Sequence, residues 1–262
     1  MDGLSIRRRI ALDIARSMRK SQEEGHPLRQ LFWECTLRCN LRCQHCGSDC
    51  KQVAATPDMP KEDFFKVLDS IAAKTDPHKV FVIISGGEPT MRADLEECGK
   101  GIYSRGFPWG MVTNGFGMTA ERFSRLLGAG LHSMTVSLDG LEENHDWLRG
   151  REGSFTRAAE TIRMAVRSGI AFDVVTCVNR RNYSQLPQLK EFLIGLGLKE
   201  WRLFSIFPQG RAALNPDLQL PPEMFRGMLD FIKETRKEGR ITASYGCEGL
   251  SLIHISEPTR LD

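Results

Sequence analysis

Short apolar runs recur along this 262-residue chain, and each is followed by a helical pattern. A run such as VFVII does not alternate polar and apolar residues, which is typical of strands covered on both faces in a parallel sheet. Six β/α units in succession predict an α/β fold, and periodicity alone leaves open whether they form part of a barrel or an open doubly wound sheet. The runs are LFWECT, KVFVIISGGEP, WGMVTNG, SMTVSLDG, FDVVTCVN and WRLFSIFPQG.

Polar segments follow the first four runs: a cysteine-rich segment, then GGEP, TNG and SLDG. The carboxyl ends of parallel strands share one edge of a sheet, and ligands bind at that edge in such folds. We therefore expect these four segments to form one site. The expected helices cover residues 61–74, 92–105, 120–127, 155–168 and 185–193, and a later helix begins at Pro221 and Pro222 and ends at Gly239.

The composition, with 41% hydrophobic and 26% charged residues, is that of a globular protein. A formal charge of +3 is too small to indicate a nucleic-acid partner, and the basic run IRRRIALDIARSMRK is typical of a solvated helix face. The N-terminus lacks the apolar region of a signal peptide, and no stretch is apolar for long enough to cross a bilayer. We expect a cytoplasmic protein whose eight cysteines are metal ligands, reactive thiols or packed side chains.

Three cysteines, Cys39, Cys43 and Cys46, lie within the eight residues CNLRCQHC. Thiolates at this spacing can hold a compact iron-sulfur cluster. A cluster of four irons and four sulfides normally takes four cysteines, so three would leave one iron open to a small molecule. Zinc is the alternative, although zinc sites usually use paired C-x2-C units separated by a longer spacer, which this chain lacks.

The remaining cysteines leave open whether the chain supplies a fourth ligand. Cys35 precedes Cys39 by four residues and could close the cluster, but its place inside LFWECT favours a packed thiol. Cys50 is expected to be a spare thiol near the loop. Cys98 and Cys177 fit packing positions in a helix and a strand.

The cysteine spacing, with GGEPT some forty residues later, resembles the radical S-adenosylmethionine (SAM) superfamily from about Leu31 to Phe207. The wider segment WECTLRCNLRCQHCGSDC is most similar to members with an auxiliary-cluster domain of the SPASM or twitch type, and among these to the branch encoded beside lipoproteins. The resemblance implies a partial (β/α)6 barrel with parallel strands. It also implies a 4Fe-4S cluster whose open iron binds the amino and carboxylate groups of SAM.

In the superfamily, the reduced cluster cleaves SAM to methionine and a 5′-deoxyadenosyl radical, which abstracts hydrogen from the substrate. The resemblance thus implies an oxidoreductase that modifies a peptide or protein and is reduced by a donor such as flavodoxin or ferredoxin. A small-molecule cofactor precursor is the alternative substrate, because no peptide-docking domain is recognisable before Leu31. A non-enzymatic zinc or iron-sulfur module is a third possibility. No catalytic acid or base is identifiable.

The segments SGGEP and SLDG carry the first expected SAM contacts. Gly86 and Gly87 let the backbone approach a ligand closely, and the resemblance assigns the SAM amino group to Glu88 and the adjoining backbone. A simple turn is the alternative for this segment. Ser137 and Asp139 lie on the same side of an extended segment, where related enzymes hold the ribose or the methionyl end of SAM. Asp139 could also cap a turn.

Further contacts are expected from residues elsewhere along the edge. Arg149, in HDWLRGREGSF, could pair with the SAM carboxylate or lie on the surface. Asn114 could face the cofactor or adopt a left-handed turn conformation. His45 occupies a position that is near adenine in the family, and it is less suited as a metal ligand. Gly210 and Arg211, in FPQGRA, are weaker adenine-side candidates.

Four segments are expected along the chain. Residues 1–30 form a helical segment, 31–240 the radical SAM core, 241–250 the start of a truncated SPASM-like or twitch-like domain, and 251–262 a non-native tail. The tail, SLIHISEPTRLD, resembles translated sequencing-adapter read-through. Cys247 stands where SPASM-like relatives begin to supply auxiliary ligands. One cysteine cannot hold such a cluster, so we expect this truncated chain to lack the auxiliary site.

Overall fold

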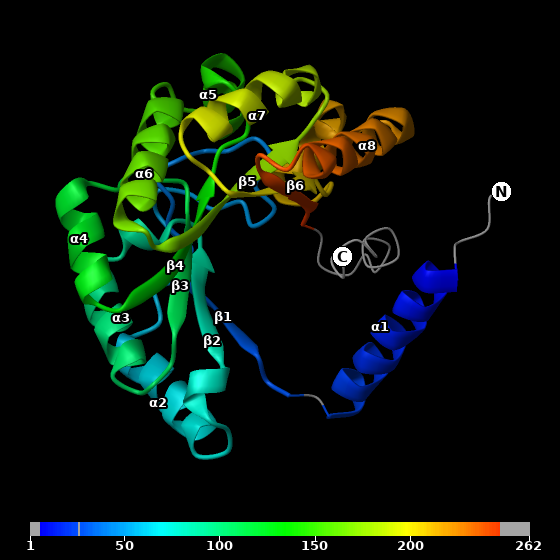
Figure 1. Cartoon of the computed structure of the whole chain (residues 1–262). Helices are drawn as coiled ribbons and strands as arrows, with labels where there is room; N and C mark the ends of the chain where they lie inside the picture. Colours follow the sequence, from blue (N-terminus) through cyan, green and yellow to red (C-terminus); the bar gives the residue numbers. More distant parts are fainter. Residues whose placement is uncertain (1–5, 26, 247–262) are drawn as a thin grey trace. The chain divides into compact units, whose positions relative to one another are not determined.

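The structure is a computed structural model that describes residues 6–25 and 27–246 (Figure 1). The chain divides into two units, of which the larger is Gln30–Gly246. The N-terminal part of the other unit contains helix α1 (Ile6–Gly25). Across the described residues, no helix is both long enough and apolar enough to span a membrane.

The expectations about Cys247 and the tail concern residues outside the described ranges. The larger unit contains every other residue that the sequence singled out for chemistry. It is described by itself below.

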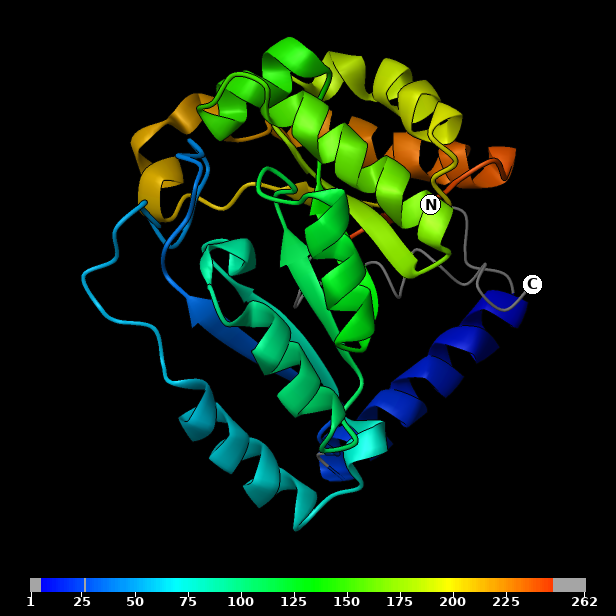
Figure 2. The same ribbon diagram turned by 90° about the vertical axis from the view of Figure 1, so that its left-hand side faces the viewer.

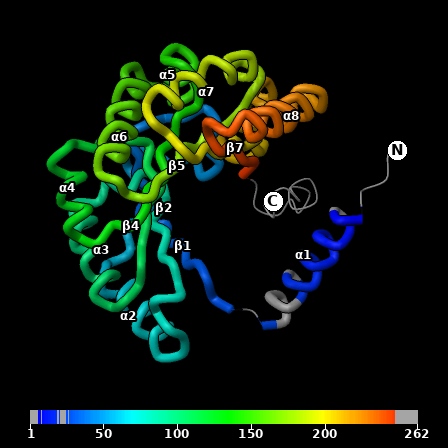
Figure 3. Tube along the Cα trace, viewed as in Figure 1, coloured from blue at the N-terminus to red at the C-terminus, as the bar shows by residue number. Residues whose placement is uncertain are grey.

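Seven parallel strands form one sheet, and each pairs with the next in chain order. Figure 3 traces the chain from β1, in blue, to β7, in red. Such an order arises when every crossover has the same hand. In the described part of the chain β1 and β7 stand at the two edges, so the barrel is open. The expectation of a partial barrel with parallel strands is confirmed. The strands are β1 (Gln30–Thr36), β2 (Phe81–Gly86), β3 (Trp109–Thr113), β4 (Leu131–Ser137), β5 (Ala171–Val178), β6 (Glu200–Ser205) and β7 (Thr242–Tyr245).

Helices between the strands form an outer layer along the sheet (Figures 1 and 2). The predicted helices are present, with ends that differ by up to three residues. The α-helices of this unit are α2 (Lys61–Ala72), α3 (Leu95–Tyr103), α4 (Ala120–Gly128), α5 (Glu142–Arg149), α6 (Ser154–Ser168), α7 (Leu186–Gly195) and α8 (Pro222–Glu238). Short 3-10 helices are η1 (Pro77–Lys79), η2 (Pro89–Met91), η3 (Tyr183–Gln185), η4 (Gly210–Leu214) and η5 (Pro216–Leu218).

Apolar side chains from the strands are buried inside this unit. Val82 and Ile84 of β2, Trp109 of β3 and Val136 of β4 are completely buried. Each buried aliphatic side chain of this size contributes about 1.5–3 kcal/mol relative to an exposed one. Slipping a strand by one residue would turn these side chains to the opposite face, so burial fixes the register. The fixed register therefore also fixes the positions of the residues that follow each strand at the carboxyl edge.

Two elements differ from the sequence expectation. Helix α5 was not predicted, because EENHDWLR has no apolar stripe. It ends at the left-handed Gly150, with φ of 66°. Strand β7 falls within residues 241–250, and it pairs in parallel with β6. Residues 242–245 therefore extend the main sheet, while the domain boundary drawn at residue 240 stays a prediction.

Candidate cofactor and metal site

A cavity of about 710 Å³, counted together with its open mouth, is lined by residues from the carboxyl edge of the sheet. The wall comes from the loop after β1, from the ends of β2, β3 and β4, and from α5 and η4. It includes most of the residues predicted from the sequence, namely Cys39, Cys43, His45, Cys46, Gly86, Gly87, Glu88, Asn114, Ser137 and Arg149.

The cysteine loop (residues 39–51) follows β1 and closes on itself, because the Cys39 amide donates to the Lys51 carbonyl at 2.8 Å. Cys39 and Cys43 are buried and Cys46 is half-buried. Burial raises the pKa of the Cys39 thiol to about 12. Without a metal this thiol is protonated at neutral pH, so metal binding must displace its proton.

The fourth thiol at the cavity is Cys50, whereas Cys35 lies elsewhere. Cys50 lines the same wall as the three predicted ligands. Cys35 is buried in β1, where its carbonyl accepts a hydrogen bond from Arg92 at 2.8 Å. Cys98 in α3 and Cys177 in β5 occupy the expected elements, and every cysteine in the described residues is free of disulfides.

The glycine pair after β2 joins this strand to the cysteine loop. The Gly87 amide donates to the Thr36 carbonyl at 2.8 Å, and the Glu88 amide donates to the Arg38 carbonyl at 2.9 Å. A Cβ atom at Gly87 would lie 2.2 Å from the Arg38 carbonyl oxygen, so any other residue would force the two segments apart. Gly86 adopts φ of 123°, which also favours glycine.

Glu88 is buried to 1% exposure, and its carboxylate ties the end of β2 to the end of β3. Its Oε1 accepts hydrogen bonds from the Thr90 hydroxyl and the Thr113 hydroxyl, both at 2.8 Å, and from the Thr90 amide at 3.2 Å. Its Oε2 accepts one from the Asn114 amide at 2.7 Å. These donors compensate a buried charge that would otherwise be costly, and Oε2 keeps a second acceptor position.

Asn114 links the end of β3 to the cysteine loop. Its Nδ2 donates to the Asn40 side-chain oxygen at 2.8 Å and lies 3.8 Å from the Cys39 sulfur. The left-handed residue of this turn is the following Gly115, with φ of 74°. Asn114 lines the cavity, and its contact with SAM stays a prediction.

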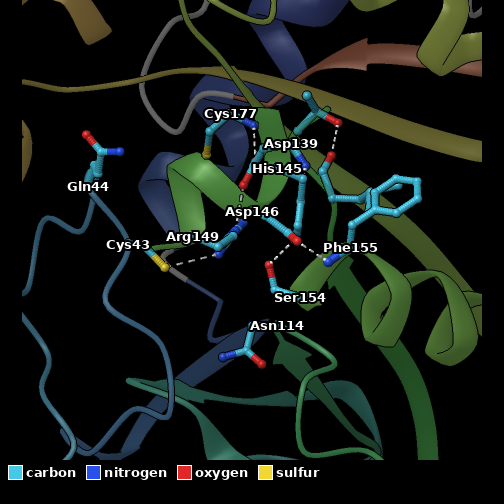
Figure 4. Close-up of polar contacts among 12 residues, drawn as sticks. Cys43, Gln44, Asn114, Asp139, His145, Asp146, Arg149, Ser154, Phe155 and Cys177 are labelled. Carbon is cyan, nitrogen blue, oxygen red and sulfur yellow. Dashed lines mark hydrogen bonds and ion pairs between the residues drawn. The ribbon is translucent and has the colours of Figure 1, made fainter. Parts of the chain in front are cut away.

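Arg149 in α5 stands between Asp139 and Cys43 (Figure 4). Its Nε donates to Asp139 at 2.6 Å, and its Nη1 lies 3.7 Å from the Cys43 sulfur. Asp139 is completely buried, and its other carboxylate oxygen accepts from the Cys177 amide at 2.8 Å. Burial would raise the pKa of Asp139, but the positive charge of Arg149 more than offsets this and holds the pKa below its ordinary value. The carboxylate is therefore ionised.

Of the predicted SAM contacts after β4, Ser137 and Arg149 line the cavity and Asp139 does not. Arg149, at 7% exposure, lines the cavity and is not a surface residue. Asp139 does not belong to the lining, and it lies behind Arg149 with its carboxylate already engaged. Ser137, two residues earlier, does line the cavity.

Two histidines near this ion pair are neutral at physiological pH. Burial lowers the pKa of His45 to about 4, and it lowers the pKa of His145 to about 4 as well. The His145 Nδ1 accepts a hydrogen bond from the Asp139 amide at 3.0 Å. His145 is not among the residues predicted for the site, because helix α5 was not predicted. His45 lines the cavity, and its buried Nδ1 has no partner among the described residues.

Arg211 lies in η4, the short helix after β6, and is hydrogen-bonded to the cysteine loop. Its Nε donates to the Cys43 carbonyl at 2.7 Å, and its amide donates to the Cys46 carbonyl at 2.9 Å. A Cβ atom at Gly210 would lie 2.5 Å from that same Cys46 carbonyl. Figure 2 shows the orange segment after β6 beside the blue loop. The sequence pointed to this segment as adenine-side, and it did not reveal these hydrogen bonds to the loop.

The residues present fit an iron-sulfur cluster together with SAM. Thiols are the soft donors that such clusters take, and three of them converge on one cavity. Gly86 and Gly87 line the same cavity with backbone alone, and the unpartnered His45 Nδ1 offers a polar contact. The fold and the site therefore define a class of protein, an open parallel β/α barrel with a metal-binding cysteine loop at the carboxyl edge.

Comparison with known families agrees with this class. The chain belongs to the radical SAM superfamily, whose family profile matches residues 33–193, more than half of the chain. Members of this superfamily use a 4Fe-4S cluster and SAM.

Individual relatives differ in what they act on. The AdoMet-dependent heme synthase of Methanosarcina barkeri is 29% identical over 220 residues, which cover 84% of this chain and 62% of the relative. The PqqA peptide cyclase of Bradyrhizobium diazoefficiens is 28% identical over 229 residues, which cover 84% and 58%. SuiB of Streptococcus suis, bound to SAM, shares the fold with a TM-score of 0.68 at 15% identity, over 97% of this chain and 59% of SuiB. The chain thus spans about three fifths of the length of these proteins.

Proposed function

We propose that the protein is a radical SAM enzyme that holds a 4Fe-4S cluster through Cys39, Cys43 and Cys46 and cleaves SAM beside it. The observation that carries the proposal is the convergence of these three thiols with the glycine turn and Arg149 on one cavity. When bound, the cluster would supply the electron that splits SAM into methionine and a 5′-deoxyadenosyl radical. Membership of the superfamily supports this chemistry.

The residues at the end of β2 would orient the amino group of SAM. Gly86 and Gly87 line the cavity, and a backbone carbonyl is a hydrogen-bond acceptor. The Oε2 atom of Glu88 retains one acceptor position beyond its bond to the Asn114 amide. An amine donor suits both features.

Arg149 would bind the SAM carboxylate. Its guanidinium has five N–H donors, of which the Nε–H is used by Asp139. The Asp139 carboxylate fixes the orientation of the Arg149 guanidinium and stabilises its charge, so we propose Asp139 as a positioning residue. Ser137, Asn114 and the neutral His45 line the rest of the cavity, and we propose that they contact the ribose, the methionyl chain and the adenine side of SAM.

For the substrate we propose a side chain of a peptide or protein. Similarity to a peptide cyclase supports this, and so does the shared fold with SuiB, which is also known bound to its precursor peptide SuiA. A small cofactor precursor is the second candidate, and it is supported by similarity to the heme synthase. We propose that flavodoxin or ferredoxin supplies the electrons. The cytoplasm remains the proposed location, because its reducing conditions preserve free thiols.

Anaerobic reconstitution with iron and sulfide tests the cluster and its chemistry. The wild-type protein should bind about four irons and four sulfides per chain and release 5′-deoxyadenosine from SAM after reduction. Changing Cys39, Cys43 or Cys46 to alanine should abolish cluster binding. Cys35→Ala is the matched control, because this buried thiol does not line the cavity, and it should retain the cluster. Colourless protein with one tightly held zinc would refute the proposal.

Deuterium transfer separates the two substrate classes. Candidate precursor peptides and iron porphyrin precursors, each labelled with deuterium, are incubated with the reduced enzyme and SAM. The class whose deuterium appears in 5′-deoxyadenosine contains the substrate. Transfer from a porphyrin and from none of the peptides would contradict the peptide proposal while leaving the radical chemistry intact.

A further inference from the structure

Cys50 is a fourth thiol at the cavity, and the three-cysteine motif does not use it. It is buried to 5% exposure in one cluster with Cys39 and Cys43, and Cys46 packs against the same cluster. Four thiols in one small group are the usual ligand set of a closed 4Fe-4S cluster.

The fold places Cys50 in the cavity through backbone contacts at the end of the cysteine loop. The hydrogen bond from the Cys39 amide to the Lys51 carbonyl brings the end of the loop back to its beginning. Directly before Cys50, Asp49 adopts φ of 47°, and among the described residues it is the one non-glycine residue with a positive φ. This conformation turns the chain inward, and aspartate tolerates it better than most residues do.

Arg211 fixes the same turn. Its Nη1 donates to the Asp49 carboxylate at 2.7 Å and to the Cys50 carbonyl at 3.0 Å. Its side chain also donates to the Cys43 carbonyl and its backbone amide to the Cys46 carbonyl, so this one residue organises the cavity wall on which all four thiols lie. Cys35, the other cysteine considered as a fourth ligand, has none of these contacts.

Building on the proposed function, we propose that Cys50 is a replaceable fourth ligand of the cluster. In the absence of SAM, its thiolate binds the iron that the other three cysteines leave open. When SAM binds, its amino and carboxylate groups take that position, the Cys50 sulfur–iron bond breaks, and the released thiolate takes up the proton that the SAM ammonium group loses when its nitrogen binds iron. The exchange changes no oxidation state. All four irons thus have a cysteine ligand until SAM binds.

The test compares wild-type protein with Cys50→Ala after anaerobic reconstitution of the full chain. Cys98→Ala is the control, because Cys98 is completely buried in α3 and does not line the cavity. Both variants should retain about four irons per chain. Without SAM, the electron paramagnetic resonance spectrum of reduced Cys50→Ala should differ from those of the wild type and the control. With saturating SAM, all three spectra should coincide.

SAM affinity gives a second readout. If the Cys50-bound form predominates about tenfold, removing it should lower the dissociation constant for SAM about tenfold, as expected when a competing state is eliminated. Equal spectra without SAM, together with equal dissociation constants, would overturn the proposal. Loss of iron from Cys50→Ala alone would overturn it too, because Cys50 would then be a permanent ligand.

Mössbauer spectra of the unaltered protein give a measurement that depends on no variant. Four similarly sulfur-ligated irons without SAM, and three plus one distinct iron with SAM, are the expected pair of spectra. One distinct iron already present without SAM would refute the role of Cys50 and leave the proposed function standing. A spectrum with four thiolate-bound irons that SAM does not alter would refute the proposed function itself.

Discussion

Two buried carboxylates at the same edge of the sheet are accommodated in different ways. Glu88, after β2, is surrounded by hydroxyl and amide donors without a charged partner among its hydrogen bonds. Asp139, after β4, is paired with the guanidinium of Arg149. Hydrogen bonds alone make Glu88 a fixed link between two strands. Asp139, in contrast, stabilises the positive charge of Arg149, and it is Arg149 that lines the cavity.

The largest effect is expected when the charge of Asp139 is removed, because Asp139 compensates the buried charge of Arg149. Asp139→Ala leaves Arg149 buried without its partner, and breaking a buried ion pair from one side costs about 3–5 kcal/mol. The free energy of unfolding, measured by urea denaturation, should fall by that amount. Glu121→Ala, which removes an exposed carboxylate in α4, is the control and should change it by less than about 0.5 kcal/mol. An unchanged midpoint in Asp139→Ala would show that Arg149 finds another partner.

The pH dependence of stability sharpens the comparison through His145, which lies beside Asp139. Its pKa is about 4 in the folded protein, mainly because of burial, against about 6.5 in an unfolded chain. Between these values the unfolded chain binds more protons. The contribution of His145 is therefore fully present above pH 6.5 and is lost as the pH falls towards 4, by about 3 kcal/mol in total.

His145→Asn removes this titration while its side-chain oxygen can still accept the Asp139 amide. The difference in unfolding free energy between wild type and variant should narrow as the pH is lowered from 7 to 4. Urea denaturation at several pH values measures it. His132→Asn is the control, because His132 lies exposed at the start of β4, and it should leave the pH profile unchanged. A constant difference across this range would contradict the assignment of a neutral, buried His145.

The smallest expected effect comes from Glu88→Gln, which keeps the shape of the side chain and removes its charge. The amide nitrogen of glutamine cannot accept a hydrogen bond, so at least one surrounding donor loses its partner. An unsatisfied buried donor costs about 1–3 kcal/mol. The free energy of unfolding should therefore fall less than in Asp139→Ala. A larger loss in Glu88→Gln would mean that the charge of Glu88, and not its hydrogen-bond geometry, holds the two strands together.

The sequence was sufficient to predict which segments meet, because apolar runs place the strand ends and parallel strands share an edge. It did not predict how the side chains pair. The Asp139–Arg149 ion pair was not predicted, since helix α5, which carries Arg149, has no apolar stripe. The two spare cysteines were equally placed, because Cys35 precedes Cys39 by four positions and Cys50 follows Cys46 by four. Only the tertiary contacts show that Cys50, and not Cys35, lies at the cavity. These contacts involve Arg211, which is distant in the sequence.

The bond from Arg211 to the Cys43 carbonyl joins positions 168 residues apart. During synthesis the cysteine loop therefore leaves the ribosome well before the residue that shapes it. At about 5–20 residues per second, this interval lasts roughly 10–30 seconds. For that time the thiols of the nascent chain lack the hydrogen bonds that Arg211 donates to the loop in the folded protein.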